Sequence, residues 1–576
     1  MKYDLVIRKG TVLDGGGNAP FEADIGVTDG CIAGVGHITD SGHEEIDAAG
    51  KLITPGFVDI HTHFDGQAMW SNRMTPSSQH GVTTVVVGNC GVGFAPCRRE
   101  DRERLIELME GVEDMPGTVI AEGLPWNWET FPEYLNAIDA QPHDIDIAAC
   151  LPHSALRVYV MGKRAVAGEI ATPGDVAKMA KLTHEAILAG AMGFSSSRTL
   201  AHKSCTGELV PSFDAGEQEL TAIAMAMKAA GRGVLQLAAD FKTWTDLDGE
   251  IGLLKRVAKV SGRSVAFPIV QANSHPEVWR EILRQVEQAN AEGLDFKAQA
   301  MPRGIGIVVG LELSTHAFSS CPTYMAMAHL PLVEQVARMR DPVVRAKLLG
   351  EKPGDPSSLL FGFGRKFDSM FKLGDPPDYE QPPEKSLAAE ARRRGIPPEE
   401  LIYDLLLEDG GKSLFYVPAA NYSYGNLDAA YTMMQHKDVV LALGDAGAHC
   451  GLMCDASYTT YLLSHWTRDR KRGGKISVPQ AVKALTSDTA SSIGLNDRGI
   501  IAPGYRADLN VIDYDRLILR APRVVHDLPA KGRRVMQDAD GFVATIVAGT
   551  VTYRNGEAMG PLPGRLIRGA QPKPTL

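Results

Sequence analysis

The chain has 576 residues, which is more than one ordinary domain but suits a large barrel with an accessory domain. Hydrophobic residues make up 44% and charged residues 22%, and the two kinds are interspersed, so we expect a folded, soluble protein. The net charge is −11 and basic residues do not gather with aromatic ones in a stripe, which argues against a nucleic-acid partner.

The first residues lack the three zones of a signal peptide, and no stretch stays apolar for the roughly 18 residues of a membrane span. Eight cysteines are scattered along the chain without a disulfide framework, which suits a reducing compartment. We therefore expect no membrane partner and a cytoplasmic location.

Short strands separated by turns are predicted near both ends of the chain. The N-terminal strands are 5–7, 11–13, 23–27, 31–35 and 51–53, with Asp29-Gly30 as one of the turns. The C-terminal strands are 507–513, 544–549 and 550–553. The two groups indicate the halves of one small β module. Such a module requires that the fold bring the termini together.

Between these ends, apolar strands alternate with helical patterns, as in a parallel β/α protein. The predicted strands are 58–60, 82–88, 145–151, 191–195, 233–237, 265–271, 296–300 and 439–443. Helices are predicted over 173–189, 217–230 and 278–291. Eight strands of this kind are the number on which a TIM barrel closes.

Residues 302–437 are too many for a βα loop of about 2 to 6 residues. We predict an insertion before the last strand, partly helical, that stands over the mouth of the barrel. The aromatic-rich segment 421–426 is a candidate for the wall of a lid that selects a substrate with an apolar acyl or aromatic portion.

Three groups of residues at predicted strand ends are candidate metal ligands. His61 and His63 have the i, i+2 spacing that sends both imidazoles to the same side of a strand, where they can bind one cation. Cys90 ends the next strand, and a bound cation would lower its pKa. Asp445 ends the last strand, where it can touch the metal and move a proton. The alternatives are structural histidines and a helix N-cap aspartate.

These motifs resemble the amidohydrolase superfamily, and within it the N-acyl-D-amino-acid deacylase group. The matching pieces span residues 55 to 508 and are Pro55-Gly56-Phe57-Val58-Asp59-Ile60-His61-Thr62-His63, 81–84, Gly88-Asn89-Cys90-Gly91, 151–157, 193–195, Gly444-Asp445, 497–499 and 504–508. The resemblance implies a metal-bearing (β/α)8 barrel over 55–499 and a small β-sandwich built from 1–54 and 500–576. It also implies that His61, His63, Cys90 and Asp445 surround the metal.

The sequence departs from that family at two strands. The family carries a metal-ligand histidine at the end of strand 5 and another at the end of strand 6. Here the strand 5 region, residues 233–240, contains no histidine, and the nearest histidine after strand 6 is His275, one or two residues late. We therefore expect one zinc or zinc-like divalent ion rather than two, because affinity depends on the number of ligands.

Other polar residues near strand ends are predicted to bind substrate: His153, Arg157, Arg198, His202, Gln236, Gln271, Asn273 and His275. Arg157 or Arg198 could hold a substrate carboxylate through a bidentate pair, although Arg157 is equally suited to a structural ion pair.

We predict a metal-dependent hydrolase that cleaves a linear amide C–N bond of a small molecule, such as an N-acyl amino acid, with Asp445 as general base and acid. Two alternatives stay open. One keeps the barrel but hydrolyses a cyclic amide, imide or lactone, or deaminates its substrate. The other is a metal-free barrel that serves as a binding scaffold. The sequence also leaves a homo-oligomer open.

Overall fold

An eight-stranded parallel sheet, strongly curled into a barrel, lies at the centre of the computed structural model, which describes residues 3–352, 354 and 359–575. Along the sheet the strands are β6 (Phe57–Asp59), β7 (Val82–Val87), β8 (Asp146–Pro152), β9 (Gly193–Arg198), β10 (Val234–Ala239), β11 (Ser264–Ile269), β12 (Phe296–Ala300) and β16 (Val439–Leu441). Every neighbouring pair is parallel, so all carboxyl ends meet at one end of the barrel. This confirms the predicted (β/α)8 class.

The two edge strands, β6 and β16, are joined just beyond their carboxyl ends by main-chain hydrogen bonds. The His63 N–H donates to the Ala446 carbonyl at 2.7 Å, and the Asp445 N–H donates to the His61 carbonyl at 3.3 Å. The segments that follow the first and last strands therefore lie side by side at the barrel mouth.

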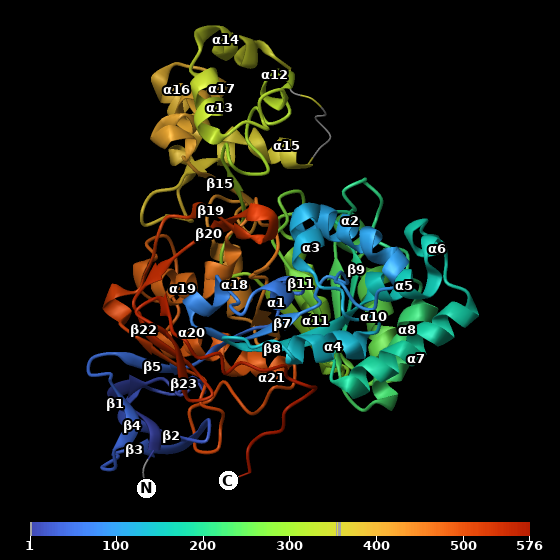
Figure 1. Ribbon diagram of the computed structural model, residues 1–576, viewed down its shortest axis with the longest axis vertical. Helices are drawn as coiled ribbons and strands as arrows, with labels where there is room; N and C mark the ends of the chain where they lie inside the picture. The colour runs from blue at the N-terminus through green and yellow to red at the C-terminus, as the bar shows by residue number, and fades with distance from the viewer. Residues whose placement is uncertain (1–2, 353, 355–358, 576) are drawn as a thin grey trace.

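Helices cover the outside of the barrel (Figure 1). All residues of β7 and β8 are buried, as expected of parallel strands covered on both faces. The helices α7 (Pro173–Ala189), α8 (Glu217–Ala229) and α11 (Val278–Ala291) match their predicted ranges. Helix α7 begins sharply because Thr172 and Asp175 form a capping box around Pro173.

Strands from both ends of the chain share one nine-stranded sheet. Its members are β1 (Tyr3–Val12), β2 (Phe21–Thr28), β3 (Cys31–Gly36), β4 (Gly42–Asp47), β5 (Leu52–Pro55), β17 (Leu509–Ile512), β22 (Phe542–Val547), β23 (Thr550–Arg554) and β24 (Glu557–Ala558). Strand β17 from the C-terminal part pairs with β5 from the N-terminal part, and both halves contribute to one hydrophobic core. The termini thus meet, as the sequence requires.

The prediction of two separate strands at 5–7 and 11–13 is wrong, because residues 5–7 and 11–12 lie in the single strand β1. Lys9 takes a left-handed backbone conformation with φ of 57°, and the pairing with β2 shifts between Ile7 and Gly10. This bulge redirects the strand, which pairs with β4 before the bulge and with β5 after it.

Part of the C-terminal segment packs on the barrel instead of the terminal sheet. Two short antiparallel pairs lie there, β18 (Ile518–Leu519) with β21 (Ala539–Asp540) and β19 (Arg523–Leu528) with β20 (Gly532–Met536). Leu517, Leu528 and Val535 belong to the barrel core.

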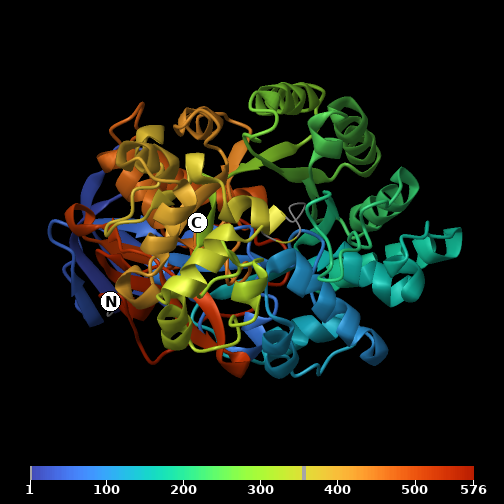
Figure 2. The same cartoon turned by 90° about the horizontal axis from the view of Figure 1, so that it is seen from above.

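The long interval between β12 and β16 forms a lobe with its own hydrophobic core, at the top of Figure 1. Its helices are α12 (Pro322–Met325), α13 (Leu332–Met339), α14 (Pro342–Gly350), α15 (Leu359–Gly364), α16 (Leu387–Arg394) and α17 (Pro398–Leu406). At its base β15 (Phe415–Ala420) pairs with β13 (Ile305–Val309) and β14 (Phe371–Lys372). Seen from above, the lobe overlies the terminal parts of the chain, whereas α7 and α8 extend to one side (Figure 2).

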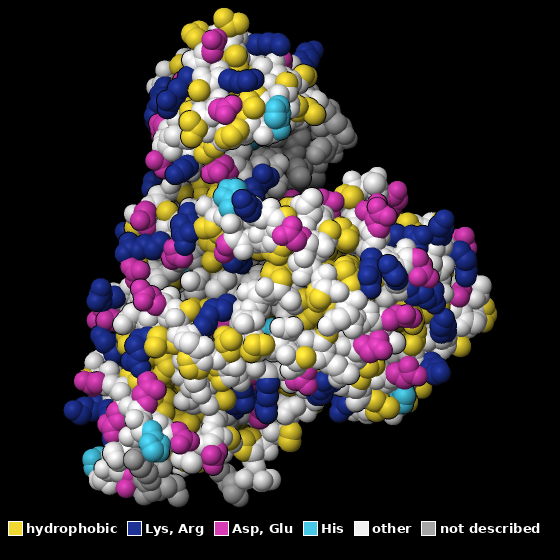
Figure 3. Space-filling model, viewed as in Figure 1, with side chains coloured by type: hydrophobic (Ala, Val, Ile, Leu, Met, Phe, Trp, Pro, Cys, Tyr) yellow, Lys and Arg dark blue, Asp and Glu magenta, His cyan; other side chains and the backbone are white. Residues whose placement is uncertain are grey.

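Acidic and basic side chains are intermixed on the visible surface of the molecule (Figure 3). Among the described residues, no helix has both the length and the apolar character that a membrane span would require.

A buried ion-pair network ties the lobe to the barrel. Glu380 of the lobe accepts hydrogen bonds from Arg470 at 2.9 and 3.0 Å and contacts His465 at 2.9 Å, both of which follow β16. Glu380 and Arg470 are 2% and 0% exposed. Burial raises the pKa of Glu380, but the bonds from His465 and Arg470 outweigh this effect and lower the pKa to about 2.

This lowered pKa predicts a pH-dependent loss of stability. Because the folded protein favours the Glu380 carboxylate, its contribution is fully present above the ordinary pKa of 4.5 and is lost as the pH falls toward 2. We expect Glu380→Gln to lower the free energy of unfolding by about 3 kcal/mol at neutral pH, and this difference to shrink below about pH 4.5. Denaturant titrations across that range measure it, with the exposed Glu384→Gln as control. An equal difference at every pH would contradict the assignment.

Candidate metal centre

Three side chains from the first two barrel strands converge at the mouth of the barrel. One ligand atom from each of His61, His63 and Cys90 lies within 4.8 Å of the other two. Both imidazoles are 1% exposed, and His61 Nε2 is 3.3 Å from Cys90 Sγ. The structure thus brings together three of the four residues that the sequence predicts around the metal.

The loop that carries Cys90 is held by its small and polar neighbours. Gly88 has φ of 77°, and a Cβ there would lie 2.2 Å from the Cys150 carbonyl oxygen, so a larger residue would displace the loop. The Asn89 side-chain amide donates to the carbonyls of Thr62 and Val86 at 2.9 and 2.8 Å. These bonds fasten the loop after β7 to the histidine segment after β6.

Asp445 approaches the same cluster from the segment after the last strand, β16, which lies beside the histidine segment. Its Oδ1 atom is 3.5 Å from His61 Nε2 and 3.7 Å from His63 Nε2. Asp445 has φ of 43°, a left-handed conformation that costs on the order of 1 kcal/mol for a residue other than glycine. The preceding Gly444 allows this turn, because a Cβ there would lie 2.6 Å from the buried Asp59 carboxylate.

Three separations among the donor atoms of these residues suit a divalent cation. A tetrahedral zinc site with bonds of about 2.0 to 2.3 Å separates its ligand atoms by roughly 3.3 to 3.7 Å. Three separations lie in that range: His61 Nε2 to Cys90 Sγ at 3.3 Å, His61 Nε2 to Asp445 Oδ1 at 3.5 Å, and His63 Nε2 to Asp445 Oδ1 at 3.7 Å. Asp445 Oδ1 is also buried without a hydrogen-bond donor among the described residues, as expected of an oxygen that faces a cation.

The environment of the cluster favours positive charge at His63, whereas burial lowers the pKa of His61. Burial raises the pKa of Asp445, but the facing histidines outweigh it and hold this pKa well below its usual range. Burial lowers the pKa of His63, but Glu113, Asp445 and Cys90 raise it well above the usual value. Burial raises the pKa of the Cys90 thiol to about 11, so this thiol needs a cation to ionise at neutral pH.

Two glutamines contact the Nδ1 side of the His61 ring, opposite to the Nε2 atom that faces the cluster. His61 Nδ1 lies 2.9 Å from Gln299 Oε1, and Gln236 Nε2 donates to the same oxygen at 3.1 Å. A ring proton on Nδ1 would be accepted by Gln299 Oε1 and would leave Nε2 free to bind a metal, whereas a proton on Nε2 would let Nδ1 accept from Gln236 Nε2. Gln236, predicted to bind substrate, therefore lies behind the cluster, 2.9 Å from His61 Nδ1.

Glu113 and His449 adjoin the cluster and were missed by the sequence analysis. Glu113 ends helix α2 (Arg102–Glu113), is 1% exposed, and lies 3.3 Å from His63 Nδ1 and 3.5 Å from His449 Nε2. The His449 N–H also donates to the Glu113 carbonyl. A carboxylate at Nδ1 leaves Nε2 of His63 to face the centre. No motif marks a helix-end glutamate in the sequence, whereas His449 follows Asp445 closely and could have been found.

Two of the predicted substrate residues, His153 and Arg157, belong to a buried ion pair. Glu219 accepts from Arg157 Nη1 at 2.5 and 2.7 Å and contacts His153 Nε2 at 2.6 Å. These contacts account for both side chains as structural groups, which is the alternative that the sequence left open for Arg157.

Arg198 and His202 differ in their relation to the centre. Arg198 forms a bidentate pair with Glu250 at 2.8 and 2.9 Å, so its guanidinium is already engaged. His202 Nδ1 contacts Ser197 Oγ at 2.8 Å. Burial and the charges of His449 and His63 lower the His202 pKa to about 3, which keeps its ring neutral at physiological pH. His202 thus lies within electrostatic reach of the cluster.

Three residues after strand 6 were predicted to bind substrate: Gln271, Asn273 and His275. Gln271 and Asn273 bond to the base of the lobe, and His275 faces solvent. The Ser423 N–H donates to Gln271 Oε1 at 3.0 Å, and Asn273 donates to the Ala419 carbonyl at 2.7 Å. His275 is exposed, with Ser274 Oγ 3.1 Å from its Nδ1. None of the three has a described contact with His61, His63, Cys90 or Asp445.

The chain matches the model of the amidohydrolase family over residues 44–553. It belongs to the amidohydrolase family. An uncharacterized protein of Mycobacterium tuberculosis is 30% identical over an alignment that covers 96% of this amidohydrolase and 92% of the relative. D-aminoacylase of Alcaligenes xylosoxydans xylosoxydans is 35% identical over 195 residues, which is 34% of this chain and 37% of the relative.

Solved structures support the same fold. A D-aminoacylase mutant in complex with CuCl2 superposes with a TM-score of 0.65, at 22% identity, covering 98% of this chain and 100% of the other. N-acyl-D-glutamate deacylase from Bordetella bronchiseptica, complexed with zinc and a phosphonate inhibitor, gives a TM-score of 0.64 at 22% identity, covering 99% and 100%. The protein is a metal-dependent amidohydrolase that acts on carbon–nitrogen bonds other than peptide bonds.

Glu113 contacts His63 on the side of the ring that faces away from the centre, and its role can be tested by substitution. We expect Glu113→Gln to weaken metal binding by about 10- to 100-fold, because the imidazole of His63 loses the carboxylate that orients it. Competition against a chromophoric chelator measures the affinity. Glu103→Gln, an exposed change on the same helix, is the matched control and should bind metal normally. Equal affinities of the two variants would contradict the role of Glu113.

Proposed function

We propose that this amidohydrolase hydrolyses the linear amide bond of an N-acyl amino acid and releases a carboxylate and a free amine. The observation that carries the proposal is the convergence of His61, His63 and Cys90, with Asp445 Oδ1 3.5 and 3.7 Å from the two imidazoles, on a barrel of the amidohydrolase family. The likeness to D-aminoacylase and N-acyl-D-glutamate deacylase supports the acyl amino acid class.

We assign His61, His63, Cys90 and Asp445 as the ligands of one divalent ion, with zinc as the first choice because nitrogen and sulfur donors suit it. When bound, such an ion polarises the scissile carbonyl and lowers the pKa of the attacking water. The single-ion assignment is supported by the environment of strands 5 and 6, where Gln236 bonds to Gln299 and Gln271 is bonded to the lobe.

Asp445 is our choice for the group that moves protons. Its side chain is 19% exposed, whereas the His61 and His63 side chains are each 1% exposed, so solvent reaches Asp445 more readily than either imidazole. Its lowered pKa keeps it ionised at neutral pH, the state needed to accept a proton from water and deliver it to the leaving nitrogen.

His449 is our candidate for a substrate contact. Its side chain is also 19% exposed, and the buried Glu113 carboxylate lies 3.5 Å from its Nε2. This neighbour favours a ring orientation in which His449 can hydrogen-bond a polar group of the substrate.

The role of Asp445 is tested by Asp445→Asn. We expect a folded variant whose turnover is lower by roughly 100- to 10,000-fold, because the amide cannot accept the proton from water. Metal content measured on the same sample, about one equivalent per chain in the wild type, separates loss of the base from loss of the ion. Near-normal turnover by metal-loaded Asp445→Asn would remove this residue from the mechanism. Asp515→Asn, an exposed change, serves as control.

The substrate class is tested with a panel of amides. We expect N-acyl amino acids to release an amine and a carboxylate, and cyclic amides, imides, lactones and amino-purines to react at least about 100-fold more slowly, measured as kcat/KM. Comparison of D and L forms assigns the stereochemistry. Ammonia release, or ring opening without fragmentation as the fastest reaction, would overturn the acyl amino acid proposal in favour of deamination or cyclic amide hydrolysis.

A further inference from the structure

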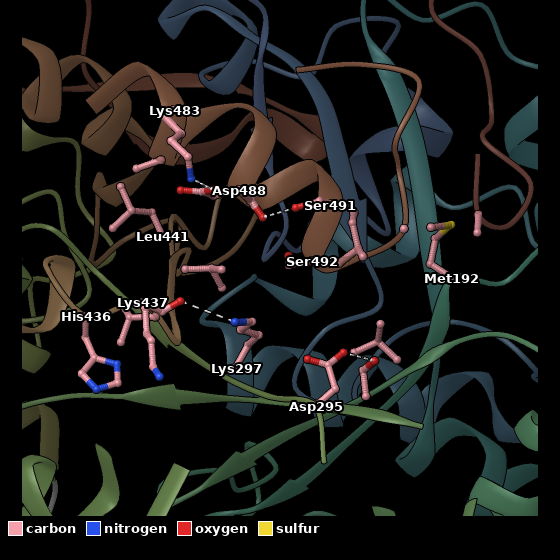
Figure 4. Close-up of a pocket in the computed structure, with 18 of the residues that line it drawn as sticks. Met192, Asp295, Lys297, His436, Lys437, Leu441, Lys483, Asp488, Ser491 and Ser492 are labelled. Carbon is pink, nitrogen blue, oxygen red and sulfur yellow. Dashed lines mark hydrogen bonds and ion pairs between the residues drawn. The ribbon is translucent and has the colours of Figure 1, made fainter. Parts of the chain in front are cut away.

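A cavity of about 700 Å³ lies at the end of the barrel opposite to the metal centre. One wall is formed by residues at the amino ends of β9 to β12, including Met192, Val234 and Ser264. The other is formed by the segment before β16 and by α20 (Val478–Leu485) and α21 (Ser487–Ser492), as Figure 4 shows. This volume falls within the roughly 300 to 1,000 Å³ of small-molecule sites.

Basic side chains outnumber acidic ones around this cavity. Its basic lining residues are Arg232, Arg263, Lys297, Lys437 and Lys483, and its acidic lining residues are Asp295 and Asp488. Lys483 and Asp488 form an ion pair with each other, and Asp295 accepts from Ser264 Oγ at 2.5 Å. The remaining excess of positive charge contrasts with the net charge of −11 for the whole chain.

Three of these cations lack a carboxylate partner among the residues that the structure describes. Arg232 donates only to the main-chain carbonyls of Ile187 and Leu188. The Nε atom of Arg263 is buried without a hydrogen-bond partner, and Lys437 is exposed. Unpaired guanidinium and ammonium groups around one cavity attract an anion, because each charge-assisted hydrogen bond is stronger than a neutral one.

Lys297 connects the cavity to the interior of the barrel. Its Nζ atom is 3.5 Å from the Lys437 carbonyl (Figure 4). The same atom is 3.3 Å from Asp438 Oδ1, and both contacts are long. The same residue lines a smaller inner cavity with Gln236 and Gln299. On strand β12, Lys297 and Gln299 are two positions apart, so they share a face at a spacing of about 6.6 Å. An anion at Lys297 would lie one layer below the Gln299 contact with His61.

We propose that this cavity binds a small organic anion with at least two negative charges, either a phosphate ester or a polycarboxylate. Arg232, Arg263 and Lys437 supply the unpaired charges, and Lys297 bonds the part of the ligand that enters deepest. The site is independent of the substrate assigned above, since it lies at the other end of the strands.

The test is calorimetric titration of the metal-loaded full chain with inorganic phosphate and, separately, with succinate. We expect saturable phosphate binding that weakens about tenfold in Arg263→Gln and again in Lys437→Gln, and that weakens further as salt is added. Lys259→Gln, an exposed lysine outside the cavity, should bind as the wild type does. Succinate binding with the same pattern assigns a polycarboxylate, and its failure assigns a phosphate ester.

Both pocket substitutions remove side chains without an ion-pair partner, so the variants should fold, which circular dichroism and the amidase activity check. Absence of saturable phosphate binding below about 10 mM in the wild type would overturn the proposal. Equal affinity in the wild type and the double variant would also overturn it, because the anion would then be bound elsewhere, for example at the metal centre.

Discussion

The candidate metal centre depends on one constraint, the closure of the barrel between its first and last strands. The His63 N–H bonds to the Ala446 carbonyl, and the Asp445 N–H bonds to the His61 carbonyl. These two bonds bring a histidine pair near the beginning of the chain against an aspartate near its end. Because the bonds belong to the main chain, the donor atoms are positioned before any ion binds, which lowers the entropic cost of forming the centre.

Both imidazoles of this centre have a polar neighbour at each ring nitrogen. Asp445 and Cys90 face the imidazole Nε2 edges, while Glu113 and Gln299 contact the Nδ1 edges of His63 and His61. Without a cation this arrangement leaves a buried carboxylate oxygen unsatisfied and a thiol whose burial opposes ionisation. A divalent ion would relieve both costs, so metal binding should also stabilise the fold around the left-handed turn at Asp445.

The two ends of the barrel strands serve different purposes. The carboxyl ends carry the cluster of His61, His63 and Cys90. They also carry the base of the lobe, and the Glu380–Arg470 ion pair fastens this lobe to the barrel. The amino ends frame a basic cavity, and Lys297 and Gln299 lie on one face of β12 between the two sites. Strand β12 thus contributes one residue to each site, because Lys297 lines the cavity and Gln299 contacts His61.

The sequence by itself determined the eight barrel strands, several helices to within a residue, and the grouping of His61, His63, Cys90 and Asp445. It could do so because strand and helix periodicity are local, and because parallel strands bring their carboxyl ends to one edge. Only the tertiary structure decided the partners of each polar side chain. Glu113 reaches His63 from a helix end, and Arg157 and Arg198 are occupied by Glu219 and Glu250. Such pairings depend on distances across the fold, and spacing along the chain carries no record of them.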